Sequence, residues 1–264
     1  MTAGRVDLGA ITLNCRVDGA EGRDWLILSN SLGATMAMWE DQMPALSARY
    51  RVLRYDTRGH GQSDAPEGPY SFADLTGDVV ALMDHFGIER TAFMGLSMGG
   101  MTGLGLAIDH APRVSRVVCA DGRADAPEGF RTMWDTRIAR VREGGLAAIV
   151  QGTVESWLTE AWRIANPDRV TAIAQMVQSN NPEGYVACCL ALKDLDYLKR
   201  LPQAGVPILY VGGDQDRGAA PEVMQAMADA TPGGVYRQIA GAAHVANINA
   251  PEAYLDAIAD FLEL

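Results

Sequence analysis

Several short runs of apolar residues alternate with longer amphipathic stretches along this chain of 264 residues. Strands that are apolar on both faces are typical of a parallel sheet covered by helices on its two sides. A further run, residues 11–17, alternates apolar and polar residues, which predicts a half-solvated edge strand. The other predicted strands lie at residues 25–28, 51–55, 91–96, 114–120, 206–211 and 235–239.

The stretches between these runs have the periodicity of helices. Residues 72–86 carry apolar side chains at positions 72, 75, 79, 82, 83 and 86, which form one stripe on a helix. Residues 99–110, 221–230 and 251–262 also predict helices, and the last two begin with proline, which favours the first helical turn. Alternating strands and helices over this length predict an α/β fold with a doubly wound, mostly parallel sheet.

One part of the chain departs from this alternation. Between residues 127 and 198 the sequence has helical periodicity and no convincing strand, as in the spacing of Phe130, Trp134 and Ile138. We therefore expect residues 1–122 and 199–264 to form an α/β core, and residues 123–198 to form a helical cap inserted over one edge of the sheet.

The pattern most specific for chemistry is Gly95-Leu96-Ser97-Met98-Gly99-Gly100, between the predicted strand 91–96 and the helix that follows. A serine flanked by glycines on a sharp strand-to-helix turn is a G-x-S-x-G nucleophile elbow. The helix N-terminus also places positive charge where an oxyanion would form. The alternative, a glycine-rich turn with an incidental serine, explains the strand–turn–helix context less well.

A serine nucleophile needs a base, and the chain has four histidines. His244 follows the last predicted strand, so it can reach back over the carboxyl edge of the sheet. We expect the other three to be packed or solvent-exposed histidines; they are His60, His85 and His110.

An acid that orients the histidine should follow a strand between Ser97 and His244. Asp214 and Asp216 both follow the run that ends at residue 211, and spacing alone leaves both open. An oxyanion hole needs two backbone N–H donors. We expect one from Met98, directly after the nucleophile, and the other from the loop at residues 29–33, at Leu32.

Charge and composition exclude several classes of partner. The chain has 22 Lys and Arg against 33 Asp and Glu, a net charge of −11, which repels nucleic acids and anionic membranes. Its four cysteines are irregularly spaced and form no CxxC motif, so we expect neither disulfides nor a metal site. The N-terminus has no signal-peptide pattern, and no apolar run could cross a bilayer. We therefore expect a cytoplasmic protein with no cofactor; its oligomeric state stays open.

Several of these motifs resemble the α/β-hydrolase superfamily, and most of all the 3-oxoadipate enol-lactonases. The resemblance covers nearly the whole chain. The stretches that carry it are Ser29–Gly33, Met38-Trp39, Leu53–Gly61, Gly95–Met101, Asn181–Tyr185 and Ala187–Cys189. It implies an α/β-hydrolase fold and a Ser…Asp…His triad.

The resemblance also chooses between the two acids. In this family the acid lies three residues after a glycine and five before a proline, and Gly213, Asp216 and Pro221 have that spacing. In the cap, Trp134 with Arg137 on one helical face and Trp157 match the family pattern, which implies substrate contacts. Arginine suits carboxylate recognition, although a solvent arginine beside a packed tryptophan is the alternative for Arg137.

The chain departs from the family in three places. Asp121-Gly122-Arg123 stands where small, uncharged residues are usual, Ser156 stands where an arginine precedes the matching tryptophan, and Val245-Ala246 replaces Leu-Ser. The sequence therefore predicts a cofactor-free serine hydrolase that cleaves a small ester or lactone through an acyl-serine intermediate. An enol-lactonase is favoured. A general carboxylesterase or a metal-free perhydrolase is the alternative within the class, and a hydrolase-fold sensor of small molecules is the alternative outside it.

Overall fold

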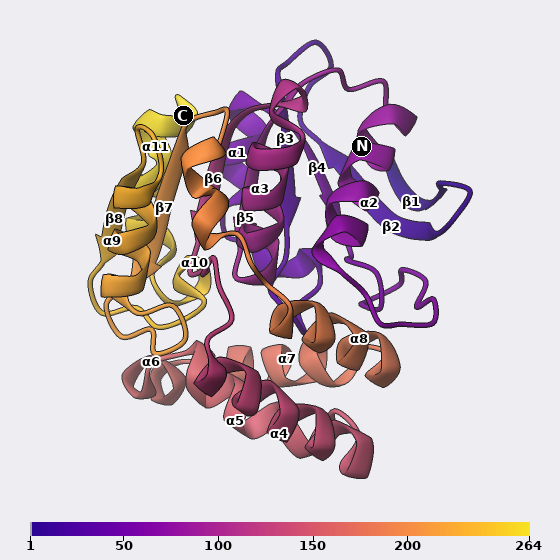
Figure 1. Ribbon diagram of the computed structural model, residues 1–264, viewed down its shortest axis with the longest axis vertical. Helices are drawn as coiled ribbons and strands as arrows, with labels where there is room; N and C mark the ends of the chain where they lie inside the picture. The colour runs from indigo at the N-terminus through magenta and orange to yellow at the C-terminus, as the bar shows by residue number, and fades with distance from the viewer. Residues whose placement is uncertain (1) are drawn as a thin grey trace.

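The computed structural model describes residues 2–264, and in that range eight strands form one sheet with the order β1-β2-β4-β3-β5-β6-β7-β8 (Figure 1). Strands β1 and β2 run antiparallel to each other, β2 runs antiparallel to β4, and the remaining pairs are parallel. The strands are β1 (Thr2–Asp7), β2 (Thr12–Asp18), β3 (Trp25–Ser29), β4 (Arg51–Tyr55), β5 (Thr91–Leu96), β6 (Val114–Ala120), β7 (Ile208–Gly213) and β8 (Val235–Ile239).

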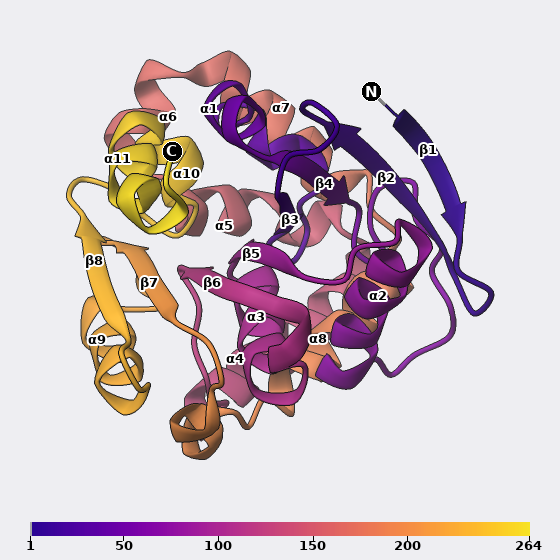
Figure 2. The ribbon, with the colours of Figure 1, turned by 90° about the horizontal axis from the view of Figure 1, so that it is seen from above.

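Helices cover both faces of this sheet, as the alternating pattern predicted. Helices α2, α3 and α9 lie on one face, and α1 and α11 lie on the other (Figure 2). The helices around the sheet are α1 (Met43–Arg49), α2 (Phe72–His85), α3 (Met98–Asp109), α9 (Pro221–Ala230), α10 (Ala246–Asn249) and α11 (Pro251–Leu262). Short 3₁₀ turns connect them at η1 (Met36–Trp39), η2 (Ala111–Arg113) and η3 (Leu198–Gln203).

The prediction of an edge strand at residues 11–17 was wrong in one respect. Strand β2 alternates buried and half-buried residues as expected, but β1 pairs along its outer side, from Thr2 opposite Val17 to Asp7 opposite Thr12. Between residues 4 and 7 only Val6 is partly buried. A strand with so little apolar surface has no periodic signal in the sequence, which is why it was missed.

Strand β7 begins two residues later than predicted. Pro207 has no N–H to give to the ladder, although its carbonyl accepts the Val117 N–H at 3.0 Å. The strand continues to Gly213 instead. This extension brings the loop after β7, with Asp216, to the carboxyl edge of the sheet.

Five further helices lie together beyond one end of the sheet, in the lower part of Figure 1. The chain leaves the sheet after β6 and returns before η3, and an isolated bridge joins Asp125 to Asp196 at the two ends of the excursion. None of the helices described in residues 2–264 is both long and apolar enough to cross a bilayer. The five are α4 (Glu128–Gly144), α5 (Ala147–Trp157), α6 (Glu160–Ala165), α7 (Pro167–Gln178) and α8 (Pro182–Lys193), called here the five-helix segment.

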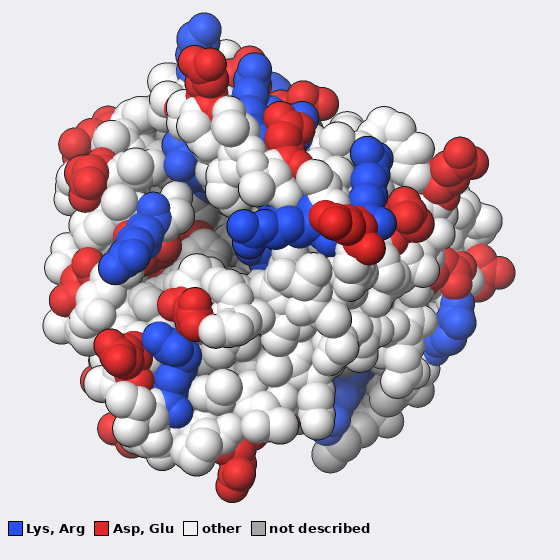
Figure 3. Space-filling view, turned by 90° about the horizontal axis from the view of Figure 1, so that it is seen from below, with Lys and Arg blue, Asp and Glu red and all other residues white. Residues whose placement is uncertain are grey.

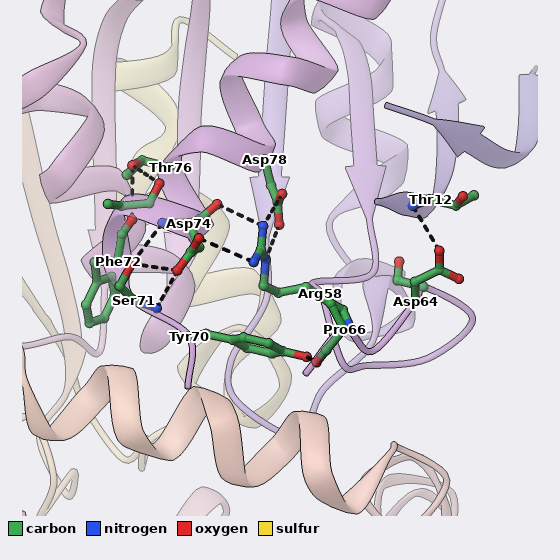
Figure 4. A network of polar contacts seen from close by, with 12 residues as sticks. Thr12, Arg58, Asp64, Pro66, Tyr70, Ser71, Phe72, Asp74, Thr76 and Asp78 are labelled. Carbon is green, nitrogen blue, oxygen red and sulfur yellow. Dashed lines mark hydrogen bonds and ion pairs between the residues drawn. The ribbon is translucent and has the colours of Figure 1, made fainter. Parts of the chain in front are cut away.

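The loop between β4 and α2 is anchored by ionic contacts (Figure 4). The Arg58 guanidinium donates to both carboxylate oxygens of Asp78 at 2.7 and 2.6 Å, and Asp74 lies 3.6 Å from it. Tyr70 donates to the Pro66 carbonyl at 2.6 Å. Because the Arg58–Asp78 pair is bidentate and largely buried, it fixes the loop more firmly than an exposed pair would.

Candidate active site

Ser97 lies at a sharp turn between β5 and α3, with φ 54° and ψ −117°. This backbone conformation is strained for a residue with a side chain and is typical of functional sites. Two glycines make the turn possible. A Cβ on Gly95 would lie 2.1 Å from the Gly99 carbonyl oxygen, and a Cβ on Gly99 would lie 2.2 Å from the Ser29 carbonyl oxygen. The strand–turn–helix context of the elbow is therefore present.

The structure brings the predicted serine, histidine and aspartate together. Ser97 Oγ lies 3.0 Å from His244 Nε2, and His244 Nδ1 lies 2.8 Å from Asp216 Oδ2. The histidine comes from the loop between β8 and α10, and the aspartate from the loop after β7. With the proton on Nδ1 donated to Asp216, Nε2 is free to accept the serine proton. This is the arrangement of a nucleophile, its base and the acid that orients the base.

The charges of the pair are coupled. Burial favours neutral imidazole, but the charge of Asp216 and its hydrogen bond outweigh burial and raise the pKa of His244. For Asp216, burial favours the neutral acid, but His244 and the backbone N–H groups of Gly218 and Ala219 outweigh it and lower its pKa. Asp216 is therefore held as the carboxylate that stabilises an imidazolium.

Asp214, the second acid that spacing left open, has a different partner. Its Oδ1 accepts the Gly241 N–H at 2.8 Å, and its side chain is exposed. The side chain of Asp216 is 1% exposed and contacts the imidazole directly. The geometry thus agrees with the choice of Asp216.

Two backbone N–H groups near Ser97 are free to bind an oxyanion. Met98 is the first residue of α3, so its N–H has no carbonyl one turn earlier to bond. Within residues 2–264, neither the Met98 N–H nor the Leu32 N–H donates to a protein acceptor. The two loops are joined directly, because the Gly99 N–H donates to the Asn30 carbonyl at 3.0 Å. The sequence predicted these two N–H groups as oxyanion donors, and their lack of a protein acceptor is compatible with that role.

A cavity of about 1440 Å³ lies between the sheet edge and the five-helix segment. Figure 3 shows the face seen from below, which is hollowed and has lysine or arginine side chains beside the hollow. On the side of the sheet, Leu32, Ser97, Asp216 and His244 are among the lining residues. The side of the five-helix segment includes Phe130, Trp134, Arg137, Trp157, Arg163 and Tyr185.

Arg137 is held in this cavity by neutral partners. Its Nε donates to the Tyr185 hydroxyl at 2.6 Å, another nitrogen contacts the Thr153 hydroxyl, and the guanidinium lies 5.8 Å from the centre of the Trp134 ring. No carboxylate in residues 2–264 pairs with it. Trp157, also predicted as a contact, lines the cavity, and its carbonyl accepts the Val245 N–H at 3.1 Å.

Sequence reasoning missed Arg163, another arginine that lines the cavity. Arg163 has no ion-pair partner in the described chain, and its Nε is buried without a hydrogen bond. A single arginine on a short amphipathic helix carries no sequence signal that separates it from a solvent-exposed one. Among the remaining histidines His85 is exposed, His110 is half-buried and His60 is buried.

Asp121 and Arg123, which stand where the family usually has small uncharged residues, both have partners in the protein. Asp121 is fully buried, and its Oδ1 accepts the Gly213 N–H at 3.0 Å. Burial, with the nearby Asp216, raises the pKa of Asp121 well above its usual range, which favours the neutral form of the side chain. Arg123 pairs with Asp125 at 2.9 Å. Burial thus acts against a charge on Asp121, and the charge of Arg123 has a carboxylate partner.

The comparisons with known proteins agree with this fold and site. The family model described as the alpha/beta hydrolase fold matches residues 24–251. The chain is 35% identical to 3-oxoadipate enol-lactonase 2 of Acinetobacter baylyi, over 94% of this chain and 92% of the relative. It is 31% identical to a putative carbamate hydrolase RutD of Caulobacter segnis, over 100% and 99%.

A solved structure supports the same assignment. The enol-lactonase from Burkholderia xenovorans LB400 superposes with a TM-score of 0.95 and 37% identity, covering 99% of this chain and 100% of that one. A family match over residues 24–251, together with this whole-chain likeness, means that the chain belongs to the α/β-hydrolase family and is a carboxylic ester hydrolase.

Proposed function

We propose that this protein is a serine hydrolase that opens a small lactone bearing a carboxylate, as an enol-lactonase does, through an acyl-serine intermediate. The observation that carries the proposal is the hydrogen-bonded chain Ser97–His244–Asp216 in a cavity that also holds the unpaired guanidinium of Arg137. The triad supplies the chemistry, and the arginine supplies a reason for the substrate class.

In the acylation step, His244 Nε2 removes the proton of Ser97 Oγ as this oxygen attacks the lactone carbonyl carbon. The carbonyl oxygen becomes an oxyanion and accepts hydrogen bonds from the N–H groups of Leu32 and Met98. Asp216 stabilises the imidazolium that forms. Removing one oxyanion donor in sites of this kind costs about 10²- to 10³-fold in kcat.

The tetrahedral intermediate then collapses with cleavage of the ring C–O bond. The ring oxygen leaves with the proton held on His244 Nε2, and it stays attached to the acyl chain because the ring has only been opened. His244 next removes a proton from water, and the hydroxide attacks the acyl carbon. The Ser97 oxygen leaves and regains its proton, so one lactone and one water give one open-chain acid.

Recognition of the substrate carboxylate is assigned to Arg137. The net charge of −11 gives no general attraction for anions, so a local cation is needed. A guanidinium has five N–H donors, and the bonds to Tyr185 and Thr153 occupy only part of them. The remaining donors are available for a bidentate carboxylate contact.

The five-helix segment acts as a cap in this proposal. Trp134 and Trp157 give the cavity apolar walls on the side opposite the triad. The bond from the Val245 N–H to the Trp157 carbonyl ties the segment to the loop that carries His244. Excluding bulk water strengthens the electrostatic contacts on which the oxyanion depends.

Carbamate hydrolysis is the second candidate, because relatives with that printed name match the whole length of the chain. The triad and its two N–H donors would serve either reaction. A small-molecule sensor is the remaining alternative, and it predicts one slow acylation in place of repeated turnover.

The decisive experiment is a comparison of two substrates on matched variants. We expect wild-type protein to turn over both an enol-lactone bearing a carboxylate and the uncharged ester 4-nitrophenyl acetate, with a Ser97-linked acyl group seen by mass spectrometry. Arg137→Ala should lower kcat/KM for the charged lactone about 10- to 150-fold, the value of a charged hydrogen bond, and leave the ester within about threefold.

The matched control is Arg140→Ala, an exposed arginine of the same helix outside the cavity. It should change neither substrate. Equal losses on both substrates in Arg137→Ala would make Arg137 a structural residue of the cap. A wild type that cleaves a carbamate but no lactone would replace this proposal with the second candidate, and a single burst without turnover would favour the sensor.

A further inference from the structure

The residue next to the expected oxyanion donor Leu32 is held at both of its backbone polar groups. The Gly33 N–H donates to His60 Nε2 at 2.9 Å, and the Gly33 carbonyl accepts a hydrogen bond from Asn180 Nδ2 at 2.8 Å. Gly33 has φ +87°, a conformation that a side chain would strain. Two side chains from distant parts of the chain therefore fix the backbone directly after Leu32.

The other side of Leu32 is fixed as well. The Asn30 carbonyl accepts the Gly99 N–H, and the Ser31 N–H lies 3.4 Å from the Met38 sulfur as its acceptor. The peptide that carries the Leu32 N–H thus lies between anchored neighbours, while that N–H itself has no acceptor in residues 2–264. Its direction depends on how those neighbours are held.

His60 can accept the Gly33 N–H because of its own surroundings. Its Nδ1 lies 3.1 Å from the Arg58 carbonyl, which leaves the proton on Nδ1 and the lone pair on Nε2. Burial lowers the pKa of His60, so the neutral form is kept. Arg58 is in turn fixed by Asp78 in the ionic network of the same loop (Figure 4).

Asn180 comes from the five-helix segment, at the turn between α7 and α8. Its Oδ1 accepts the Gly61 N–H at 2.8 Å, and its Nδ2 also reaches the Met176 and Val177 carbonyls. The side chain is 5% exposed. Among residues 2–264, it makes the one hydrogen bond between the five-helix segment and the loop of residues 29–34.

We propose that Asn180 and His60 are positioning residues that hold Gly33 so that the Leu32 N–H is aimed at the oxyanion, and that Asn180 thereby couples the seating of the five-helix segment to the chemical step. This inference rests on the proposed function. Because the contact acts on a donor used in the transition state, its loss should lower kcat and leave KM nearly unchanged.

The test uses Asn180→Asp, which has the same shape. A carboxylate can still accept the Gly61 N–H, but it cannot donate to the Gly33 carbonyl. Its second oxygen would instead face the Gly33 carbonyl oxygen and repel it. We expect kcat for 4-nitrophenyl acetate to fall about 10- to 100-fold, with KM within about threefold. Affinity for a boronic acid, whose adduct with Ser97 places an oxygen in the oxyanion site, should fall by a similar factor.

Asn166→Asp is the matched control. Asn166 belongs to the same segment, and its Nδ2 donates to the Trp162 carbonyl at 2.9 Å without contact to the oxyanion loop. It should keep wild-type kcat and boronate affinity. Asn180→Ala, which removes the bond without adding charge, provides the same measurement if Asn180→Asp does not fold, and His60→Leu tests the other contact.

The outcomes separate the two proposals. A wild type that turns over neither the carboxylate-bearing lactone nor 4-nitrophenyl acetate would refute the proposed function. An active wild type together with a folded Asn180→Asp or Asn180→Ala variant of equal kcat would refute the positioning role alone. A rise in KM with unchanged kcat and boronate affinity would likewise refute it, because it would assign Asn180 to substrate binding.

Discussion

Replacing Asp216 with asparagine should abolish nearly all activity while keeping the shape of the site. Asp216 Oδ2 accepts the His244 Nδ1 proton at 2.8 Å, and its Oδ1 accepts the Gly218 N–H at 2.7 Å. An asparagine keeps its oxygen on Gly218 and turns its NH₂ group toward Nδ1. His244 Nδ1 must then accept a hydrogen bond from this NH₂ group, so the imidazole proton moves to Nε2. His244 can then no longer take the proton of Ser97.

The magnitude follows from the same contacts. The replacement removes the correct tautomer of the base and the buried carboxylate that stabilises the imidazolium. A wrong tautomer in a serine triad costs about 10⁴-fold in kcat, so we expect a loss of about 10³- to 10⁴-fold. Asp214→Asn is the matched control, because that carboxylate bonds the Gly241 N–H on an exposed loop. It should stay within about threefold of wild type.

The assay is kcat/KM for 4-nitrophenyl acetate between pH 5 and 9, with the melting temperature of each variant. Asp216 raises the pKa of His244 against the effect of burial, so wild-type activity should fall as the pH drops through a value above the ordinary pKa of a histidine side chain. Without that carboxylate burial dominates, and the acid limb of the residual activity should move to lower pH. A larger loss in Asp214→Asn than in Asp216→Asn would refute the assignment.

Three further expectations concern other parts of the site. Asp121 has a raised pKa in the folded protein, so above about pH 4 the unfolded chain loses this proton more readily and the wild type loses stability as the pH rises. Asp121→Asn removes this titration, so urea denaturation should show its unfolding free energy rising relative to that of the wild type over the same range. Gly99→Ala places a Cβ 2.2 Å from the Ser29 carbonyl and should cost about 3 kcal/mol or more, whereas Gly129→Ala meets no atom within 4 Å and should be close to neutral in the same denaturation experiment. Arg163→Ala should lower kcat/KM for the charged lactone about two- to fivefold and leave kcat/KM for the uncharged ester unchanged. No change on either substrate would show that Arg163 takes no part in substrate recognition.

The parts of the molecule that the sequence predicted are those where chemistry or burial restricts the residue types. Strand β5 is buried at every position, and its residues are continuously apolar after Thr91. The elbow admits only glycine two residues before and two residues after Ser97, because a Cβ on Gly95 or Gly99 would meet backbone atoms. A serine nucleophile also requires a base and an acid on later strands. Each of these constraints leaves a local pattern in the sequence.

The contacts of Asn180 and His60 leave no such pattern. Each bonds a backbone group of Gly33, across 147 and 27 residues respectively, and a main-chain N–H or carbonyl is the same for every residue type. No complementary side chain marks the partner in the sequence. His60 was therefore expected only to be packed or solvent-exposed, and Asn180 was not singled out at all, although both are buried next to the expected oxyanion loop.

The charge in the cavity bears on the substrate more directly than the net charge of the chain. An ionised Asp121 would oppose an anionic substrate, but burial raises its pKa and favours the neutral form, which accepts the Gly213 N–H, and Arg123 is paired with Asp125. The guanidinium groups of Arg137 and Arg163 have no carboxylate partner in the described chain. A substrate carboxylate would supply one, whereas an uncharged ester would leave both cations unpaired in a partly desolvated site. In the proposed function, these two arginines would supply the local positive charge that a carboxylate-bearing lactone needs and that the net charge of −11 does not provide.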